Sequence, residues 1–416
     1  MHFERTTKKA LTRDIYKVCD GEQTRVILGE YSPKSIWQPK NILKTVIEAC
    51  LQKTSLEDIC ESKETPSADR VQDRLNELEL DQIDQLLSGW MNEHVNRLRF
   101  HKNTSLTISI DLYQQPYYGD PSPDWIIGTK RKKGTNYCIC FALVTITTNR
   151  IRCPIYVKLL TKKQYSDKIG LFTLIWSKLP INLAIKRVLL DRWFSYDPVI
   201  KFLEERGLEY VMATRRCLSV KKSLATIQES LSQLAEFAGI NFKDKRELGI
   251  WCRKRGLDTF TVKHITIKKG GTPTTLVAAF VRIKTHNRDP AKRWTYALYL
   301  YITNCHVSPR HIIKLYSKRW IIETDIRCIG TFKAVTNSTS PQLRFLFFGL
   351  AVLFDLLWIL YSTLINRFLD GSIEAFKNYF FISIKQSDTL QFTAQKFLRC
   401  VRDDIFPLLA FRGGDA

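Results

Sequence analysis

The sequence has few acidic residues for its size, and it lacks several common patterns. It holds 41 Asp and Glu residues against 64 Lys and Arg residues, which gives a net charge of +23 over 416 residues. It shows no internal repeat and no low-complexity linker. Hydrophobic residues make up 44% of the chain and aromatic residues 12%, which excludes a mostly disordered basic tail. The length predicts roughly two to three folded domains.

The 11 cysteines include no Cys-x2-Cys pair, which argues against a zinc clip. The closest pair, Cys138 and Cys140, would share one face of a strand. Cys305, His306 and His311 have no second pair of ligands at metal-binding spacing. The N-terminus is charged and lacks the apolar run of a secretory signal. These observations predict reduced thiols and a cytoplasmic protein.

The positive charge is concentrated in two blocks. Residues 129–170 contain ten basic residues and one acidic residue, and residues 240–295 contain 14 basic and four acidic residues. By contrast, residues 51–90 contain ten acidic and four basic residues. Basic blocks of this kind are typical of proteins that bind a polyanion, and nucleic acid is the most common one.

Residues 41–99 are predicted to be helical. Apolar residues such as Ile42 and Val46 recur at helical spacing, and Ser67 can cap a second helix. A helix, a short turn and a helix are compatible with a DNA-reading helix-turn-helix. The acidic charge of residues 51–90 argues against that role, because a recognition helix needs flanks that tolerate phosphate, and the alternative is a structural helical bundle. Both interpretations stay open.

Residues 106–214 alternate between strand and helix patterns, which is typical of an α/β domain. The predicted strands are 106–112, 137–148, 155–160, 186–191 and 209–214, and the predicted helices are 165–179 and 198–206. Residues 219–300 break this rhythm. Two alternating runs, 259–268 and 275–284, flank a Gly-containing turn and predict a hairpin. This region therefore reads as a β-rich insertion.

Residues 345–365 form an apolar run with one charged residue, Asp355. The run is long enough to span a membrane. An Asp in the middle of a lone membrane helix would be costly. We therefore expect a core helix buried between layers of the α/β domain.

Three acids stand out by position. Asp111 and Asp191 end or follow apolar strands, and Glu323 lies on a predicted helix. Carboxylates gathered at one place repel each other unless a divalent cation holds them. Two such cations, about 4 Å apart, can activate an attacking oxygen and stabilise the leaving oxygen at a phosphodiester. Asp120 is an alternative to Asp111 as the first acid.

Tyr316, Arg319 and Glu323 have the spacing Tyr-x2-Arg-x3-Glu, and Asp191 stands between a buried strand and two aromatic residues. With Asp111 after the apolar strand, these motifs make the chain resemble the DDE transposases of bacterial and archaeal insertion sequences. The resemblance is greatest to the cut-and-paste group with this third motif, and it covers residues 100–370. The family's later Lys would fall at Gly330, where the nearest bases are Arg327 and Lys333.

The resemblance implies an α/β fold, with an RNase H-like mixed sheet flanked by helices. It also implies a helical N-terminal domain and a β-rich insertion between the second and third acids. The expected domains are a helical domain for DNA-end binding or support at 1–100, the first part of the catalytic core at 101–218, the insertion at 219–303, the last core helices at 304–370, and a helical tail at 371–416.

The resemblance further implies a DNA transposase that hydrolyses phosphodiesters and transfers strands at the ends of an insertion sequence. Asp111, Asp191 and Glu323 would hold two Mg²⁺ ions, with Mn²⁺ as a substitute and Asp111 bridging both. Arg319 would bind a phosphate near the cut, and Tyr316 would contact the DNA backbone or simply pack its helix.

Further DNA contacts are expected from aromatic and basic residues. Trp193, beside the second acid, can stack on an unpaired base or pack in the core. The run of basic residues from Lys130 to Lys133, predicted to be a loop, can follow the phosphates of the DNA or merely be solvated. A base after Glu323 would add a further contact to DNA. These expected residues are Trp193, Lys130, Arg131, Lys132, Lys133 and Lys333.

The implied partners are double-stranded DNA at terminal inverted repeats and target DNA, both bound by a homodimer. No membrane partner is expected. The implied location is the cytoplasm of a prokaryote, at the nucleoid. Two other interpretations stay open. One is an RNase H-like DNA nuclease without strand transfer, and the other is a non-catalytic DNA-binding protein derived from a transposase.

Overall fold

The computed structural model describes residues 13–29, 37–61, 65–98, 105–147, 152–214, 220–223, 225, 245–256, 259–267, 270–284 and 294–369. The expected C-terminal tail at 371–416 lies outside the described residues, as does most of 215–244. The side chain of Lys132 is also outside the description.

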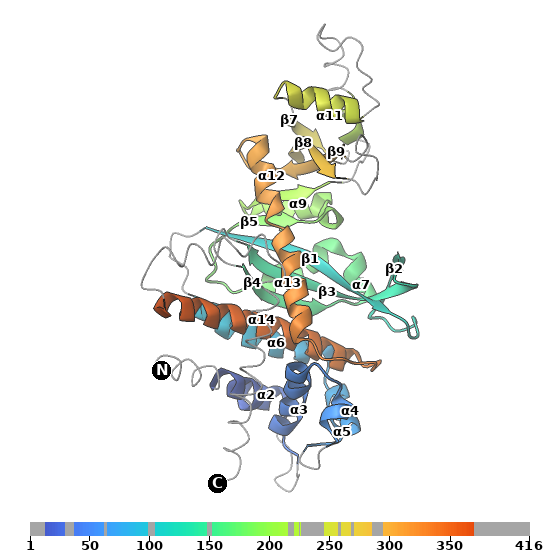
Figure 1. Cartoon of the computed structure of the whole chain (residues 1–416), viewed down its shortest axis with the longest axis vertical. Helices are drawn as coiled ribbons and strands as arrows, with labels where there is room; N and C mark the ends of the chain where they lie inside the picture. The colour runs from blue at the N-terminus through green and yellow to red at the C-terminus, as the bar shows by residue number, and fades with distance from the viewer. Residues whose placement is uncertain are drawn as a thin grey trace.

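The N-terminal part is helical, as the spacing predicts. Its helices are α2 (Glu22–Leu28), α3 (Pro39–Gln52), α4 (Leu56–Ile59), α5 (Ala68–Asn76) and α6 (Leu80–Arg97). The predicted cap at Ser67 is confirmed, because its hydroxyl accepts a hydrogen bond from the Arg70 N–H at the start of α5. α6 packs on β4 and α14, so this helix joins the N-terminal part to the sheet, and α2–α5 lie beyond it (Figure 1).

The centre of the molecule is a mixed sheet of nine strands within the described residues. Its order is β2-β3-β1-β5-β6-β9-β8-β7, and β4 also pairs with β3. β1 is parallel to β5, and β5 is parallel to β6, whereas the other pairs are antiparallel. The strands are β1 (Leu106–Tyr117), β2 (Ile126–Lys132), β3 (Thr135–Thr147), β4 (Arg152–Leu159), β5 (Ile185–Leu190), β6 (Glu209–Ala213), β7 (Thr259–Thr266), β8 (Pro273–Lys284) and β9 (Trp294–Thr303).

Helices flank this sheet, which gives the α/β, RNase H-like arrangement that we expected. The path β4-β3-β1-β5-β6 joins three antiparallel strands to two parallel ones. Figure 1 shows α13 running from α12 across the sheet toward α14. The remaining helices are α7 (Lys162–Ser166), α8 (Lys168–Lys178), the short 3-10 helix η1 (Arg192–Phe194), α9 (Asp197–Glu205), α11 (Lys245–Lys254), α12 (Pro309–Ser317), α13 (Trp320–Phe332) and α14 (Pro341–Leu369).

The predicted hairpin of the β-rich region is confirmed, because β7 and β8 pair antiparallel. Its relation to the core was not visible in the sequence. β9 pairs with β8 along its whole length and also with β6, from Tyr301 to Thr303. The β-rich region therefore continues the hydrogen bonding of the central sheet beyond β6.

The apolar helix α14 is packed inside the molecule. In the described part of the chain, residues Pro341–Leu360 are the one stretch long and apolar enough to cross a membrane, and 89% of its apolar window is buried. Asp355 is fully buried, and its Oδ1 lies 3.1 Å from Arg152 Nη2 at the start of β4. The pairing with Arg152 explains how an apolar core helix accommodates a carboxylate.

Candidate active site around Arg319

Asp111 lies inside a strand. The prediction that Asp111 ends its strand is wrong, because β1 continues to Tyr117. The reason is that β1 has two neighbours that differ in length. Its pairing with β5 stops at Ile110 and Leu190, whereas its pairing with β3 runs to Tyr117. Asp111 therefore stands where β5 leaves β1, next to the residue that follows Leu190.

That residue is Asp191, which begins a tight turn. Its carbonyl oxygen accepts a hydrogen bond from the Phe194 N–H at 3.0 Å. Phe194 is fully buried and packs edge-on against Phe172 of α8, with ring centres 6.2 Å apart. The buried ring thus anchors the turn that carries Asp191 at the end of β5.

Arg319 links the acids across the fold. It stands between α12 and α13 and is 8% exposed. Its Nη1 lies 2.5 Å from Asp111 Oδ2, and its Nη2 lies 3.3 Å from Glu323 Oε1, one helical turn later. The buried Nε of Arg319 has no hydrogen-bond partner among the described residues. One guanidinium therefore bridges two carboxylates and still has an unpaired donor.

The three predicted acids are close enough to act on one another electrostatically. Burial raises the pKa of Asp111 to about 6, and the carboxylates of Asp191 and Glu323 raise it as well. The Arg319 guanidinium and the Leu112 N–H act in the opposite direction. Burial lowers the pKa of Arg319, but Tyr316 and the three acids outweigh it, so that the pKa is raised. The structure thus brings Asp111, Asp191 and Glu323 together around one cation.

The donor chemistry of this cluster suits a divalent metal ion. Carboxylate oxygens are the ligands that hard cations such as Mg²⁺ prefer. In the described part of the chain, no group of three His, Cys, Asp or Glu side chains is close enough to hold an ion in this arrangement. Arg319 instead supplies the positive charge between Asp111 and Glu323. The Glu323 side chain is 52% exposed, so the cluster is open on that side.

Asp120, the alternative first acid, lies elsewhere. It occupies an exposed turn, where its carboxylate accepts hydrogen bonds from the Ser122 N–H, at 3.0 Å, and from the Ser122 hydroxyl. This is the usual role of an Asp that stabilises a turn. Asp111 is the candidate that the structure places with the other two acids.

Tyr316 and Lys333 contact different strands of the sheet, β9 and β1. Tyr316 is 7% exposed and packs against Tyr301, with ring centres 4.7 Å apart. Burial raises its pKa to about 12, and its ring lies 5.5 Å from the Arg319 guanidinium carbon. Lys333 Nζ donates to Gln115 Oε1 at 3.1 Å, and Gln115 shares the strand face of Asp111. The other candidate base, Arg327, is exposed on α13.

The expected basic run lies on the β2–β3 hairpin. Lys130 and Arg131 are on β2, and Lys133 occupies the turn with a φ of 51°. The Tyr118 hydroxyl donates to the Lys133 carbonyl at 2.8 Å and fixes this turn. Figure 1 shows the hairpin at the far end of the sheet from α11 and β7. Within the sheet, β3 separates β2 from β1, the strand that carries Asp111.

Trp193 connects these two regions, through residues that the sequence did not single out. Its ring lies 5.2 Å from the ring of Tyr165 on α7. The Lys168 ammonium lies 4.9 Å from the Trp193 ring centre and 5.8 Å from that of Tyr196. Tyr165 and Lys168 gave no signal beyond their place in the basic block at 129–170. They show that Trp193 is part of an aromatic and basic surface beside Asp191.

Comparison with known proteins identifies a family model that covers most of the residues of this site. Residues 113–353 match the model of a family described as "Transposase DDE domain", a match that includes Asp191 and Glu323 and begins two residues after Asp111. The chain is also similar to a piggyBac transposase, in a cryo-EM structure of its synaptic complex with hairpin DNA. That similarity has 12% sequence identity and a TM-score of 0.49, and it covers 95% of this chain and 82% of the other. A search of curated proteins gave no match.

Proposed function

Because the chain belongs to the transposase DDE domain family, we propose that it is a cut-and-paste DNA transposase of an insertion sequence. It hydrolyses phosphodiesters at the ends of the element and transfers the freed strands to target DNA. The observation that carries this proposal is the convergence of Asp111, Asp191 and Glu323 around Arg319. The Tyr-x2-Arg-x3-Glu spacing supports the insertion-sequence group with this third motif.

Asp111, Asp191 and Glu323 are the residues that would hold the metal ions, which we propose to be two Mg²⁺ with Mn²⁺ as a substitute. When bound, such ions activate the attacking oxygen and stabilise the leaving oxygen. Asp111 interacts electrostatically with both of the other acids, so we propose it as the carboxylate that both ions would share.

Arg319 is suited to bind a phosphate of the DNA beside these acids. A guanidinium presents five donors in a planar fork that matches phosphate oxygens. In this structure the fork contacts Asp111 and Glu323, and its Nε is unpaired. Tyr316, packed against Tyr301 and close to the guanidinium, holds Arg319 in place. Lys333 adds positive charge on the strand face of Asp111.

The DNA partners follow from the charge and the chemistry. The β2–β3 hairpin, with Lys130, Arg131 and Lys133, offers phosphate contacts beyond the acids. Since two ends of an element must be held together before transfer, we infer a homodimer on DNA. We place the protein at the nucleoid in the cytoplasm of a prokaryote, where its terminal inverted repeats and target DNA would be found.

A cleavage and joining assay tests the proposal. The purified protein is incubated with Mg²⁺, target plasmid and a duplex carrying the inverted repeat that flanks its coding sequence. We expect nicked, cut and joined products, which disappear in Asp111→Asn, Asp191→Asn and Glu323→Gln while DNA binding persists. Asp120→Asn is the matched control and should stay active. Cleavage without joining would indicate the nuclease, and binding without cleavage the non-catalytic protein; both results would contradict the proposal.

A further inference from the structure

The outer side of α12 carries two lysines that have no acidic partner. Residues 305–322 contain no Asp or Glu. Lys314 is exposed, and Lys318, which continues the helical conformation at the end of α12, is half-buried. Within the described residues, neither ammonium group forms an ion pair. Residues four apart are neighbours on a helix surface, so the two lysines lie on the same side of α12.

A third cation lies close to these lysines. Burial lowers the pKa of Lys318, and the positive charges of Arg187 on β5 and of Lys314 lower it further. Glu209 on β6 pairs with Arg187 and also with Lys186, whose Nζ lies 3.3 Å from Glu209 Oε1. One carboxylate therefore faces several bases, and an anion bound beside the lysines would reduce the repulsion between them.

α12 lies on the face of the sheet that carries Asp111. Side chains alternate along a strand, and Ser109 of β1 pairs with Leu189 of β5, so Leu189 shares the face of Asp111. Ile312 and Leu315 of α12 pack in one cluster with Leu189. The apolar side of α12 therefore covers this face, and its lysine-bearing side points away from the sheet.

The two lysines follow one another away from the Arg319 cluster. Lys318 precedes Arg319 in the chain, and Lys314 lies one helical turn, about 6 Å, further along α12. A DNA duplex carries about one negative charge per 1.7 Å of its length. A backbone that contacts Arg319 and runs along α12 would therefore bring phosphates to both lysines.

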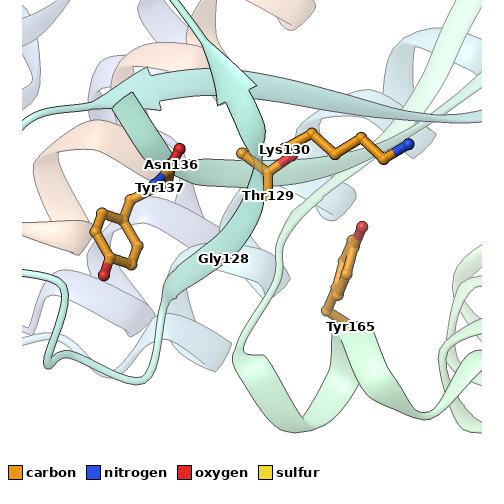
Figure 2. Close-up of a pocket in the computed structure, with 6 residues that line it drawn as sticks. All are labelled: Gly128, Thr129, Lys130, Asn136, Tyr137 and Tyr165. Carbon is orange, nitrogen blue, oxygen red and sulfur yellow. The ribbon is translucent and has the colours of Figure 1, made fainter. Parts of the chain in front are cut away.

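The basic residues of the β2–β3 hairpin lie differently. Gln114 follows Asp111 by three residues, so it lies on the opposite face of the sheet, and its Nε2 donates to the Tyr165 hydroxyl at 3.5 Å. Figure 2 shows the Lys130 side chain on the same side as Tyr165. Lys130 can meet DNA that passes around β2, at the end of the described sheet. DNA that lies over the acids meets α12 instead.

We propose that Lys314 and Lys318 bind backbone phosphates of the DNA duplex next to the phosphate held by Arg319. The outer side of α12 is then a DNA-binding surface that leads away from the acids over β5 and β6. This inference rests on the proposed function, because it assigns a further part of the DNA substrate to the same site.

α11 provides a matched control, because it covers the opposite face of the sheet. Val277 of β8 packs in the cluster with α12, whereas Phe280, three residues later on β8, packs with Cys252 of α11. Arg253 and Lys254 of α11 are exposed. They carry the same charge as the two lysines of α12 but lie away from the face of the acids.

The salt dependence of DNA binding tests the inference. Fluorescence anisotropy in Ca²⁺ buffer gives the Kd for the inverted-repeat duplex at several KCl concentrations. Each phosphate contact contributes about 0.9 to the slope of log Kd against log salt concentration. We expect the double variant Lys314→Gln with Lys318→Gln to lower this slope by about 1.8. Arg253→Gln with Lys254→Gln should keep the wild-type slope.

A conservative variant separates charge from other effects. Lys314→Arg with Lys318→Arg keeps both positive charges and should keep the wild-type slope. Urea unfolding curves of each variant show whether it is folded.

Two results would overturn the inference while leaving the proposed function intact. One is an unchanged slope in the folded glutamine variant of α12. The other is an equal loss of slope in the α11 variant, which would assign the effect to net charge. A wild-type protein that does not bind the duplex would instead overturn the proposed function, and this inference with it.

Discussion

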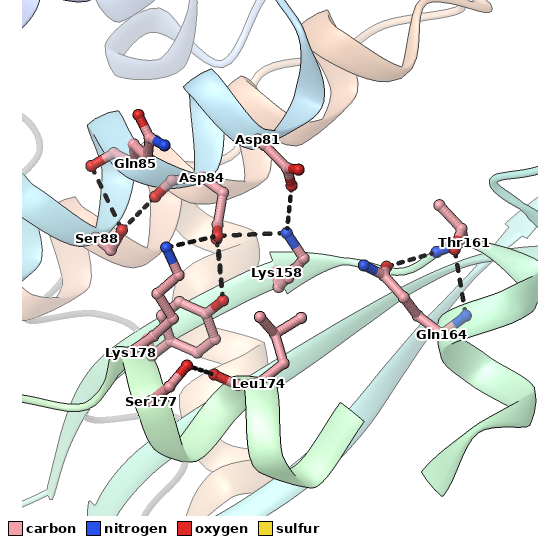
Figure 3. A network of polar contacts seen from close by, with 11 residues as sticks. Asp81, Asp84, Gln85, Ser88, Lys158, Thr161, Gln164, Leu174, Ser177 and Lys178 are labelled. Carbon is pink, nitrogen blue, oxygen red and sulfur yellow. Dashed lines mark hydrogen bonds and ion pairs between the residues drawn. The ribbon is translucent and has the colours of Figure 1, made fainter. Parts of the chain in front are cut away.

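Two groups of buried charges in this molecule differ in how completely they are paired. The first joins α6 to β4 and α8 (Figure 3). Asp84 is 2% exposed, and its carboxylate contacts the Tyr156 hydroxyl at 3.0 Å, Lys158 Nζ at 3.3 Å and Lys178 Nζ at 3.9 Å. The second is the Arg319 cluster, where a buried Nε is unpaired among the described residues and Glu323 is largely exposed.

The difference indicates what each group does. A buried charge is stable only when its partners replace the water that it has lost. Asp84 has those partners within the protein, so its network needs no ligand and holds three elements together. Arg319, Asp111 and Glu323 satisfy each other only in part, and one side of the cluster is open to solvent. The second group is therefore the one that can exchange its internal partners for metal ions and phosphate.

The largest expected effect is on activity. Asp111→Asn should reduce DNA cleavage by about 100-fold or more, because it removes a charged ligand from the reacting centre. Asp84→Asn, assayed at a temperature where it is folded, should cleave like the wild type. Initial rates on the same duplex measure both. Equal loss in the two variants would remove the distinction between the two groups.

The next largest effect is on stability. Here we expect the Asp84 group to matter more than the Arg319 cluster. Asp84→Asn should lower the free energy of unfolding by about 3 kcal/mol, because it removes the buried one of the two carboxylates that contact the Lys158 ammonium. Urea unfolding measures the loss. Asp81→Asn is the matched control, since Asp81 lies 3.1 Å from Lys158 Nζ but is 83% exposed. It should cost about 1 kcal/mol or less. A larger loss for Asp81→Asn than for Asp84→Asn would contradict the pairing described for Lys158.

A smaller effect on stability compares the solvent-accessible Arg319 cluster with the buried pair of Arg152 and Asp355. Arg319→Met removes the internal cation from Asp111 and Glu323 and should cost about 2 kcal/mol in the presence of a chelator. Mg²⁺ should restore much of this stability, because it supplies the missing positive charge. Arg152→Met, which removes the partner of the fully buried Asp355, should be destabilised without rescue. Thermal unfolding with and without Mg²⁺ measures this, and rescue of both variants or of neither would contradict the comparison.

The smallest expected effect is a pH dependence of the free energy of unfolding, which comes from a buried histidine of α6. His94 on α6 is buried, and burial lowers its pKa from the ordinary value of 6.5. The unfolded chain therefore takes up the proton at a higher pH than the folded one. Stability should be complete above pH 6.5 and should fall as the pH drops below it. His94→Gln should flatten this slope in urea unfolding at several pH values; an unchanged slope would assign it to other groups.

The sequence predicted what depends on neighbouring residues. Alternating apolar residues gave the β7–β8 hairpin, and a Ser at the right position gave the cap of α5. These signals are local, because side-chain periodicity and capping act over a few residues. The acids were found in the same way, by their positions after strands and by their spacing on a helix.

The sequence did not predict what depends on distant segments. The ion pair between Asp111 and Arg319 joins residues 208 positions apart. The pairing of β9 with β6, which makes the β-rich region part of the central sheet, also lies beyond any local pattern. The position of Asp111 inside β1 follows from the unequal lengths of the two neighbouring strands. Each of these features arises from tertiary packing, which one sequence does not display.

The central claim is that Asp111, Asp191 and Glu323 form a metal site. Mn²⁺ binding is its most direct test. Electron paramagnetic resonance of a Mn²⁺ titration measures the ions bound by the wild-type protein, Asp111→Asn, Asp191→Asn, Glu323→Gln and Asp84→Asn. We expect the wild type and Asp84→Asn to bind equally, and the other three to bind at least about 10-fold more weakly. Undiminished Mn²⁺ binding in all three acid variants would contradict the account.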